Sequence, residues 1–307
     1  MKKTVYIISG PTASGKSIIA YYLAKRIGGE IINCDSVQLY KYMDIGSAKP
    51  NEKYMLKIPH HLYSIADPDK PVTVADYQQM ALSTIDDILQ RGRVPIVCGG
   101  TGLYLNSIIY DMNFGAEPDD LKRREELERL ADERGSEYMH QYLQGLDPDA
   151  ASRIHPNNVR KVIRAIEAFE YGKGIGNLAD VELNPDYDFK FYALNMEREW
   201  LYERINNRVY KLITDGLVRE VSSLLARGYS PELPAMKGIG YKETIAYLYG
   251  ECDLESATDE IQKNTRHYAK RQMTWLKRYD FIRWIEIQKG DTAGEIVDRI
   301  LNYKTEE

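Results

Sequence analysis

The sequence has few cysteines and no long apolar run. Its three cysteines are far apart in 307 residues and form no C-x-x-C pair, which excludes a disulfide framework and a zinc site built on paired cysteines. Cys34 and Cys98 each end a short apolar stretch, so we expect both to be small, buried core residues. No stretch approaches the roughly 20 apolar residues of a membrane helix, so we expect no membrane span.

The N-terminal residues 1–10 are basic and then apolar, as the start of a signal peptide would be. Their apolar run is too short for a signal peptide, and it leads directly into a glycine-rich loop. We therefore expect a cytoplasmic protein. Its content of 43% hydrophobic and 28% charged residues is ordinary for a globular chain that stays in solution.

The formal net charge of −5 argues weakly against nucleic-acid binding, but backbone phosphates respond to local basic surface rather than to the total charge. Residues 261–284 carry seven lysines or arginines against one acidic residue, interleaved with Tyr268, Trp275, Tyr279 and Trp284. This mixture suits phosphate contact and base stacking. The alternative is a solvated helix whose aromatic side chains pack inward.

The order of the apolar patterns predicts an α/β fold. Short apolar runs at residues 4–9, 30–35 and 94–98 indicate buried strands, and helical spacing appears at residues 16–27 and 75–91. Strands that alternate with helices of this length form βαβ units and a parallel sheet. The sequence therefore predicts a P-loop-type parallel sheet core flanked by helices.

A charged, mostly helical segment interrupts this pattern. We expect a discontinuous α/β core domain at residues 1–115 and 189–307, and a helical insertion domain at residues 116–188. Strand patterns return at residues 189–196 and 281–287. Further helices are expected at residues 199–215, 218–226 and 262–278.

The clearest motif is a phosphate-binding loop between the first strand and the first helix. It matches G-x-x-x-x-G-K-[ST] and consists of Gly10, Pro11, Thr12, Ala13, Ser14, Gly15, Lys16 and Ser17. Its glycines let successive backbone N–H groups surround phosphate oxygens at a helix N-terminus. Lys16 would reach the terminal phosphate, and Ser17 would ligate Mg²⁺. The loop binds the phosphate chain of ATP or of another diphosphate, so it does not identify the reaction.

Polar residues also follow two other strands at the carboxyl edge of the sheet, where open α/β folds bind ligands. Asp35 ends the second strand, where it could hold Mg²⁺ through water, act as a general base, or be a surface turn residue. Thr101, in the glycine-rich turn after the third strand, could donate a hydrogen bond to a phosphate. His60 and His61 are adjacent and have no third ligand nearby, so we expect a structural role for them.

Seven strings along the chain resemble the tRNA dimethylallyltransferase family. Residues 10–17 (GPTASGKS) and 35–50 (DSVQLYKYMDIGSAKP) are similar to the family's phosphate loop and to the block that follows it. The other strings are PHHLYSI, GGTGLY, RIHPNN, GIGYKE and TRHYAKRQMTWLKR, at residues 59–65, 99–104, 153–158, 238–243 and 265–278. They occur in family order over nearly the whole chain, and together they are far more specific than the phosphate loop alone.

The resemblance implies a P-loop NTPase-like fold whose loop binds the diphosphate of dimethylallyl diphosphate, with Mg²⁺ as cofactor. The acceptor would be the exocyclic N6 of the adenine just 3′ of the tRNA anticodon. The eukaryotic members carry an added zinc-finger region, and this chain is similar to the shorter, bacterial form. A monomer is expected.

The resemblance also implies roles for single residues. Asp35 would remove an N6 proton as the new bond forms, because an aromatic amine is a poor nucleophile. The groups that would stabilise the departing diphosphate are Lys16, the loop amides, Thr101 and Mg²⁺ near Ser17. Arg208, with Arg204 one helical turn earlier, is our candidate arginine for the same task, and a surface or structural arginine is the alternative.

An adenine in the anticodon loop must leave its stack to reach a pocket, and the family reads it with the residues around the general base. In this chain these residues are Asp35, Ser36, Val37, Gln38 and Thr101. Gln38 suits the polar edge of adenine, with a buried or surface glutamine as the alternative. Further candidate tRNA contacts are Arg123, Arg124, Arg160 and Arg164. For Arg123 and Arg124, ion pairs with neighbouring glutamates on an exposed helix are an equally good explanation.

Three other functions compete with this interpretation. A small-molecule kinase would need ATP on the loop and a second acid after residues 94–98, which run into Gly99 and Gly100 instead. A prenyltransferase that uses free AMP would need neither the helical insertion nor the basic segment. A P-loop protein that binds RNA without chemistry would not depend on Asp35.

Overall fold

The structure is a computed structural model that describes residues 3–112, 121–171 and 181–303. It divides into two compact units, Met1–Asp111 with Asn184–Glu307, and Met112–Leu183. The expected domain boundary between residues 115 and 116 lies outside the described residues. Residues 187 and 188, which the sequence assigned to the insertion, belong to a strand of the first unit.

Within the described residues, the first unit holds six strands in one sheet. The strand order from edge to edge is β3-β2-β4-β1-β5-β6, and every pairing is parallel. The strands are β1 (Lys3–Ser9), β2 (Gly29–Cys34), β3 (His60–His61), β4 (Val94–Gly99), β5 (Tyr187–Met196) and β6 (Arg283–Ile287). The all-parallel sheet confirms the predicted α/β fold.

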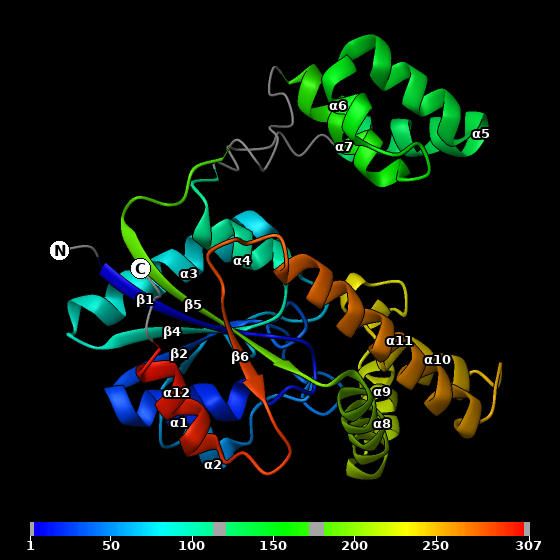
Figure 1. Ribbon diagram of the computed structural model, residues 1–307. Helices are drawn as coiled ribbons and strands as arrows, with labels where there is room; N and C mark the ends of the chain where they lie inside the picture. The colour runs from blue at the N-terminus through cyan, green and yellow to red at the C-terminus, as the bar shows by residue number, and fades with distance from the viewer. Residues whose placement is uncertain (1–2, 113–120, 172–180, 304–307) are drawn as a thin grey trace. The chain divides into compact units, whose positions relative to one another are not determined.

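Helices cover both faces of this sheet (Figure 1). α1 (Lys16–Ile27) and α12 (Ala293–Leu301) lie on one face, and α3 (Val74–Gln90) and α4 (Gly102–Ile109) lie on the other. α3 begins with a capping box, because the Thr73 hydroxyl accepts the N–H of residue 76, whose carboxylate accepts the N–H of Thr73. None of the helices in the described ranges combines the length and apolar character that a membrane span requires.

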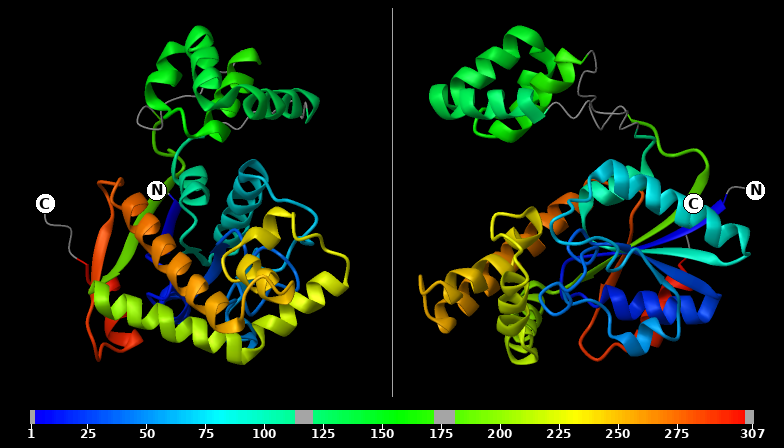
Figure 2. Two further views of the ribbon diagram at one scale, coloured as in Figure 1. Left: turned by 90° about the vertical axis from the view of Figure 1, so that its right-hand side faces the viewer. Right: turned by 180° about the vertical axis from the view of Figure 1, so that it is seen from behind.

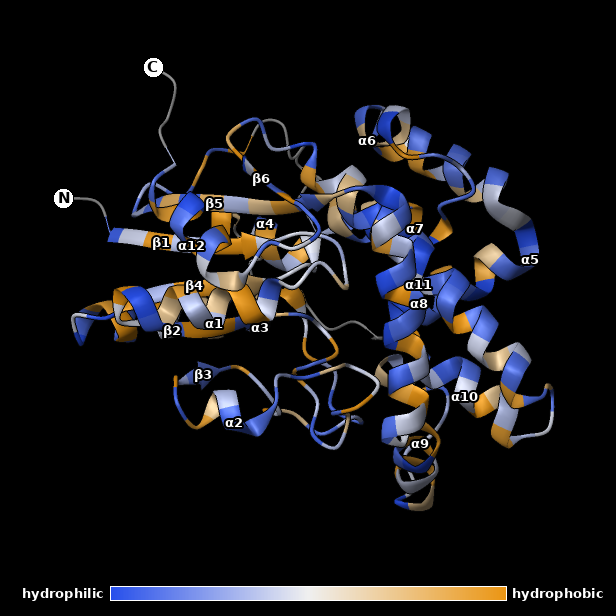
Figure 3. Cartoon of the chain, turned by 60° about the horizontal axis from the view of Figure 1, so that its bottom comes forward, coloured by the Kyte–Doolittle hydropathy of each residue, from blue (hydrophilic) through white to orange (hydrophobic). Residues whose placement is uncertain are grey.

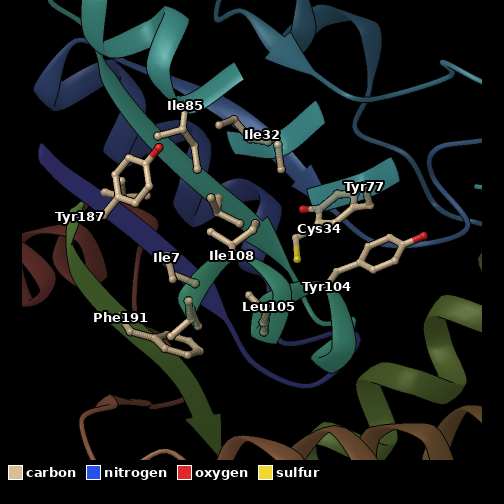
Figure 4. Close-up of a cluster of buried hydrophobic side chains, with 14 of the residues drawn as sticks. Ile7, Ile32, Cys34, Tyr77, Ile85, Tyr104, Leu105, Ile108, Tyr187 and Phe191 are labelled. Carbon is tan, nitrogen blue, oxygen red and sulfur yellow. The ribbon is translucent and has the colours of Figure 1, made fainter. Parts of the chain in front are cut away.

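One core layer lies between the sheet and the α3–α4 face (Figure 4). Tyr77 and Tyr104 stack there with ring centroids 3.9 Å apart, and the Tyr77 hydroxyl donates to the carbonyl of Asn33 over 2.8 Å. Cys34 belongs to this layer and Cys98 to the layer on the α1 face, so both cysteines are buried as predicted. Apolar strand residues fill both layers, which fits a parallel sheet covered on both faces.

A group of helices lies at the end of the sheet toward which the strands point (Figure 2). Its main members are α8 (Arg198–Asp215), α9 (Leu217–Ala226), α10 (Tyr241–Leu248) and α11 (Leu254–Leu276). Two short elements complete the unit, α2 (Glu52–Met55) and η2 (Pro234–Lys237). Hydrophilic residues dominate α8 and α11, in contrast to the apolar strands (Figure 3).

α11 starts eight residues earlier than the apolar pattern predicts. The Asp253 carboxylate caps the helix by accepting the N–H of Ser256 over 2.8 Å. A side-chain cap of this kind satisfies a backbone donor that the first turn would otherwise leave unpaired. The first turns are polar, so the apolar period alone did not reveal them.

The second unit is helical, with α5 (Leu121–Leu146), α6 (Pro148–Arg153) and α7 (Val159–Glu170) around a core of its own. α5 is kinked at Gly135, which has a φ of 81°. Two ion pairs join α5 to α7. Arg123 donates to Glu170 over 2.6 and 2.9 Å, and Arg124 donates to Glu167 over 2.8 and 3.1 Å.

Candidate active site

The phosphate loop joins β1 to α1 as the sequence predicts. A Cβ atom added at Gly10, which has a φ of 143°, would lie 2.8 Å from the carbonyl oxygen of Leu194 on β5. Only glycine fits there, because both the space and the backbone angle exclude a side chain. Gly15 begins α1 with a φ of 98°, so the loop turns directly into the helix N-terminus. The N-terminus of α1 is therefore open for an anion.

The ammonium of Lys16 is held inside the loop. Its Nζ donates to the carbonyl of Pro11 over 2.9 Å. Burial, helped by the nearby Arg208 guanidinium, lowers the pKa of Lys16 to about 8, against the opposing effects of Cys98 and Asp35. A buried cation of this kind gains most when an anion binds beside it.

The loop also presents hydroxyl groups to a phosphate and its metal. Ser14 Oγ is buried and, among the described residues, has no hydrogen-bond partner. Ser17 lines a cavity of about 440 Å³ with Gly15, Lys16 and Arg208. Mg²⁺ is usually bound by few protein oxygens, together with water and substrate phosphates. One hydroxyl beside a phosphate loop fits that mode of binding.

Two arginines of α8 reach the phosphate loop. Arg204 Nε donates to the carbonyl of Ala13 over 2.9 Å, and Arg208 Nη1 lies 3.4 Å from the hydroxyl of Thr12. Arg204 is exposed and stacks over Trp200, whereas Arg208 is half-buried. Burial lowers the pKa of the Arg208 guanidinium below its usual range, and the Asp35 carboxylate opposes this. Both side chains line the cavity beside the phosphate loop.

Asp35 directly follows β2, and its carboxylate is held from one side. Oδ1 accepts the backbone N–H of Val37 over 2.9 Å and, more weakly, that of Gln38 over 3.4 Å. The backbone of Asp35 is braced by the side chain of Asn33, which exchanges two hydrogen bonds of 3.0 Å with it. Both of these hydrogen bonds to the carboxylate go to Oδ1, and Oδ2 accepts none from the residues that the structure describes.

Asp35 faces a cavity of about 300 Å³ that is bordered by several elements. Ser36, Val37 and Thr12 line its near side, and Arg208 closes it toward the phosphate loop. The other lining residues are Gly46, Ser47, Val209, Leu212, Lys237, Gly238, Ile239, Ile261, Thr265, Tyr268 and Arg271. We call this space the acceptor cavity. Because Arg208 lines both cavities, the acceptor cavity and the phosphate-loop cavity meet at its guanidinium.

Gln38 does not line the acceptor cavity, although the sequence suggested it as a reader of adenine. Its side chain is buried, and Nε2 donates to the carbonyls of Ser47 and Ala48 over 2.9 and 3.4 Å. Both of its donor hydrogens therefore face the chain itself. In this structure Gln38 holds the segment of residues 44–48 in place.

Glu220 and Tyr241 hold the same segment, and sequence reasoning missed both. The Glu220 carboxylate accepts the N–H groups of residues 44, 45 and 46 over 2.8, 2.7 and 2.9 Å, and also the Tyr241 hydroxyl over 2.9 Å. A Cβ atom at Gly46 would lie 2.5 Å from the Tyr241 ring, so only glycine fits. The sequence of α9 shows a helix with one apolar face and one glutamate, and nothing in it indicates that this glutamate binds residues 44–46.

The structure places the remaining candidate residues as follows. Arg160 is exposed, and the Arg164 side chain is 50% exposed, with Nε 4.0 Å from Glu167. Arg123 and Arg124 form the ion pairs with α7 described above. His60 Nδ1 lies 2.7 Å from the carbonyl of residue 58, and His61 Nε2 lies 2.7 Å from the buried carboxylate of residue 30. Both histidines thus have partners in the edge strand region.

The arrangement defines a class of protein. A phosphate loop that meets a carboxylate-bearing cavity at one arginine is the site of a P-loop transferase, which passes a group from a phosphorylated donor to an acceptor. The chain belongs to the IPP transferase family, whose sequence model matches residues 38–279.

Relatives match over nearly the full length. A tRNA dimethylallyltransferase of Alkaliphilus oremlandii is 48% identical over 303 residues, which cover 98% of this chain and 97% of the relative. The full-length tRNA isopentenylpyrophosphate transferase of Bacillus halodurans, a crystal structure, is 40% identical with a TM-score of 0.74, over 98% of this chain and 95% of that one. A eukaryotic dimethylallyltransferase acting on tRNA is 27% identical with a TM-score of 0.83, over 99% and 81%.

Proposed function

We propose that this chain transfers a dimethylallyl group from dimethylallyl diphosphate to the exocyclic N6 of the adenine just 3′ of the tRNA anticodon, releasing diphosphate. The activity that its relatives are named for supports the reaction. tRNA is modified in the cytoplasm, so the proposal places the reaction there, with the chain acting as a monomer.

One observation carries this proposal. Asp35 lines a cavity that meets the phosphate loop at Arg208. A carboxylate beside the acceptor and a cation beside the donor are the two groups that alkylation of an aromatic amine needs. A kinase would also need a phosphate loop, but the relatives' names favour prenyl transfer to tRNA.

The chemistry divides between the two cavities. The adenine N6 attacks C1 of the dimethylallyl group, the bond from C1 to the diphosphate oxygen breaks, and the N6 proton passes to Oδ2 of Asp35. General-base assistance of this kind contributes about 10²–10⁴ in rate. The backbone N–H groups of Val37 and Gln38 hold the other carboxylate oxygen, so the accepting oxygen keeps its direction.

The departing diphosphate is stabilised by Lys16, Arg208 and the loop amides, with Thr101 as a further donor. Mg²⁺, when bound, would neutralise charge on the diphosphate oxygens, and the Ser17 hydroxyl would hold it. Positive groups fixed at the leaving oxygens before the reaction are more effective than mobile ones, because they need no reorganisation.

We assign tRNA contacts to both units. In the core, Asp35, Ser36, Val37 and Thr101 surround the flipped adenine. In the helical unit, Arg160 is exposed, and Arg164 is half-exposed although it pairs with Glu167, so both suit phosphate contact. Arg123 and Arg124, predicted tRNA contacts from the sequence, already pair with glutamates of α7, so their first role is to hold α5 against α7.

The proposal is tested by transfer of a radiolabelled dimethylallyl group. The purified chain is incubated with Mg²⁺ and labelled dimethylallyl diphosphate, with unmodified tRNA in one reaction and AMP in the other. Label in tRNA alone supports the proposal. Label in AMP would assign the chain to free-nucleotide prenylation, and label in neither would contradict prenyl transfer.

A further inference from the structure

Helix α11 lies along the acceptor cavity and continues to the phosphate loop. Ile261, Thr265, Tyr268 and Arg271 line the cavity at helical spacing. The next residue, Gln272, is 5% exposed, and no role in the proposed reaction has been assigned to it so far.

The Gln272 amide joins two loops that come from different strands. Its Oε1 accepts the backbone N–H of Thr12 over 2.8 Å, and its Nε2 donates to the carbonyl of Gly100 over 3.1 Å. Reversing the amide would set N–H against N–H and oxygen against oxygen, so these partners fix its orientation. The side chain therefore ties the phosphate loop to the turn that carries Thr101.

Side chains of α11 pack tightly against the turn that carries Thr101. A Cβ atom at Gly100 would lie 2.2 Å from Nε2 of Gln272, and one at Gly102 would lie 2.5 Å from the Trp275 ring. Thr101 stands between these two glycines. Because α11 closes on both of them, the position of the Thr101 hydroxyl is set by side chains of this helix.

We propose that Gln272 is a positioning residue that holds the phosphate loop at a fixed distance from the turn of Gly100 and Thr101, which is hydrogen-bonded to the residue after Asp35. This inference rests on the proposed function. It explains how the phosphate loop keeps a constant position relative to the acceptor cavity. A misplacement of about 1 Å between reacting groups can cost about a hundredfold in rate. Gln272 lines neither of the two cavities, so it acts through Thr12 and Gly100.

The first test replaces Gln272 with methionine, which has a similar length and no polar amide. The matched control is Gln262→Met on the same helix, because Gln262 is also buried and its Nε2 has no partner among the described residues. We expect Gln272→Met to lower kcat about tenfold or more. The Kd for tRNA should stay within about twofold, and Gln262→Met should keep wild-type kcat.

The second test replaces Gln272 with glutamate. A protonated glutamate offers the same pattern as the amide, a carbonyl for Thr12 and an O–H for Gly100, whereas an ionised one offers no donor. The ratio of variant to wild-type kcat should therefore rise as pH falls from 8 to 6. The pH dependence that both proteins share cancels in this ratio. A side chain that merely fills space would give a ratio independent of pH.

The outcomes separate this inference from the proposed function. Wild-type kcat in Gln272→Met, or a loss explained entirely by a weaker Kd for tRNA, would overturn the positioning role. A wild-type chain that forms no product would overturn the proposed function instead. In that case the role of Gln272 can still be tested by measuring the binding of inorganic diphosphate. Gln272→Met should bind diphosphate more weakly than the wild type. Equal binding would contradict the positioning role.

Discussion

The backbone N–H of Ser36 donates a hydrogen bond to the hydroxyl oxygen of Thr101 over 3.1 Å. This bond connects the residue after Asp35 with the glycine-rich turn after β4. Because the Thr101 oxygen accepts from Ser36, its own proton is directed to another acceptor. The Tyr268 hydroxyl, which forms a side-chain hydrogen bond with Thr101, is one such acceptor, and a diphosphate on the neighbouring loop would be another.

Replacing Thr101 with valine should therefore lower kcat by about tenfold to a hundredfold, as loss of one transition-state donor does. Thr101→Ser keeps the hydroxyl and serves as the control, with kcat expected within about threefold of wild type. The two variants are compared by steady-state kinetics with saturating tRNA. Equal kcat values for the valine and serine variants would show that the Thr101 hydroxyl has no role in the reaction.

The pKa of Lys16 predicts how donor binding depends on pH. The protonated ammonium binds diphosphate, and its pKa of about 8 in the free chain means that this form is lost as pH rises through 8. If the bound lysine stays protonated, the Kd for dimethylallyl diphosphate without tRNA should rise about tenfold between pH 7 and pH 9.

The control for this titration is Lys16→Met. It should bind the donor weakly at both pH values and lose the pH dependence, which calorimetry can measure. A wild-type Kd that stays constant from pH 7 to pH 9 would contradict the account of Lys16.

Arg208 and Arg204 form a matched pair, one helical turn apart on α8. Arg208→Gln should lower kcat/KM for dimethylallyl diphosphate about a hundredfold, because its guanidinium lies between the two cavities. Arg204→Gln should cost less than about tenfold, since this side chain is exposed and lines the phosphate-loop cavity but not the acceptor cavity. Equal losses in initial-rate measurements would contradict the distinction drawn between them.

Much of the fold and part of the site could be predicted from the sequence. The strands β1, β2, β4, β5 and β6 each showed an apolar run, and the phosphate loop and Asp35 follow such runs directly. Residues at the ends of parallel strands meet at one edge of the sheet, so their proximity follows from the fold alone. The family resemblance then supplied the reaction.

The residues that hold the site together could not be predicted in the same way. Glu220 and Gln272 lie on helices that carry several other polar residues, and nothing in the sequence distinguishes these two from the solvent-exposed ones. Their roles depend on partners 174 and 172 residues away, at Gly46 and Gly100. Only tertiary structure brings such partners together. Gln38 was predicted to read adenine, with a buried glutamine as the alternative, and in the structure its Nε2 donates to the carbonyls of Ser47 and Ala48.

The Glu220 carboxylate provides a further prediction. Glu220→Gln keeps the shape but turns an NH₂ group toward N–H donors, so residues 44–46 lose part of their support. The change should destabilise the chain by about 1–3 kcal/mol. It should also lower kcat/KM for tRNA about tenfold, because Gly46 and Ser47 line the acceptor cavity.

Chemical denaturation and steady-state kinetics measure these two effects. Asp298→Asn is the control, since that carboxylate forms an exposed ion pair with Arg26 and should affect neither. Unchanged kinetics in Glu220→Gln would show that the segment of residues 44–46 does not shape the acceptor cavity.

The central claim is that Asp35 accepts the N6 proton while the phosphate loop holds the donor. Nucleoside mass spectrometry tests it, with unmodified tRNA, Mg²⁺ and dimethylallyl diphosphate, without ATP, for the wild-type chain and for Asp35→Asn. We predict a dimethylallyl mass gain on adenosine with the wild type, a rate about 10²–10⁴ lower with the variant, and equal tRNA binding by both. Turnover by Asp35→Asn at the wild-type rate would contradict the account.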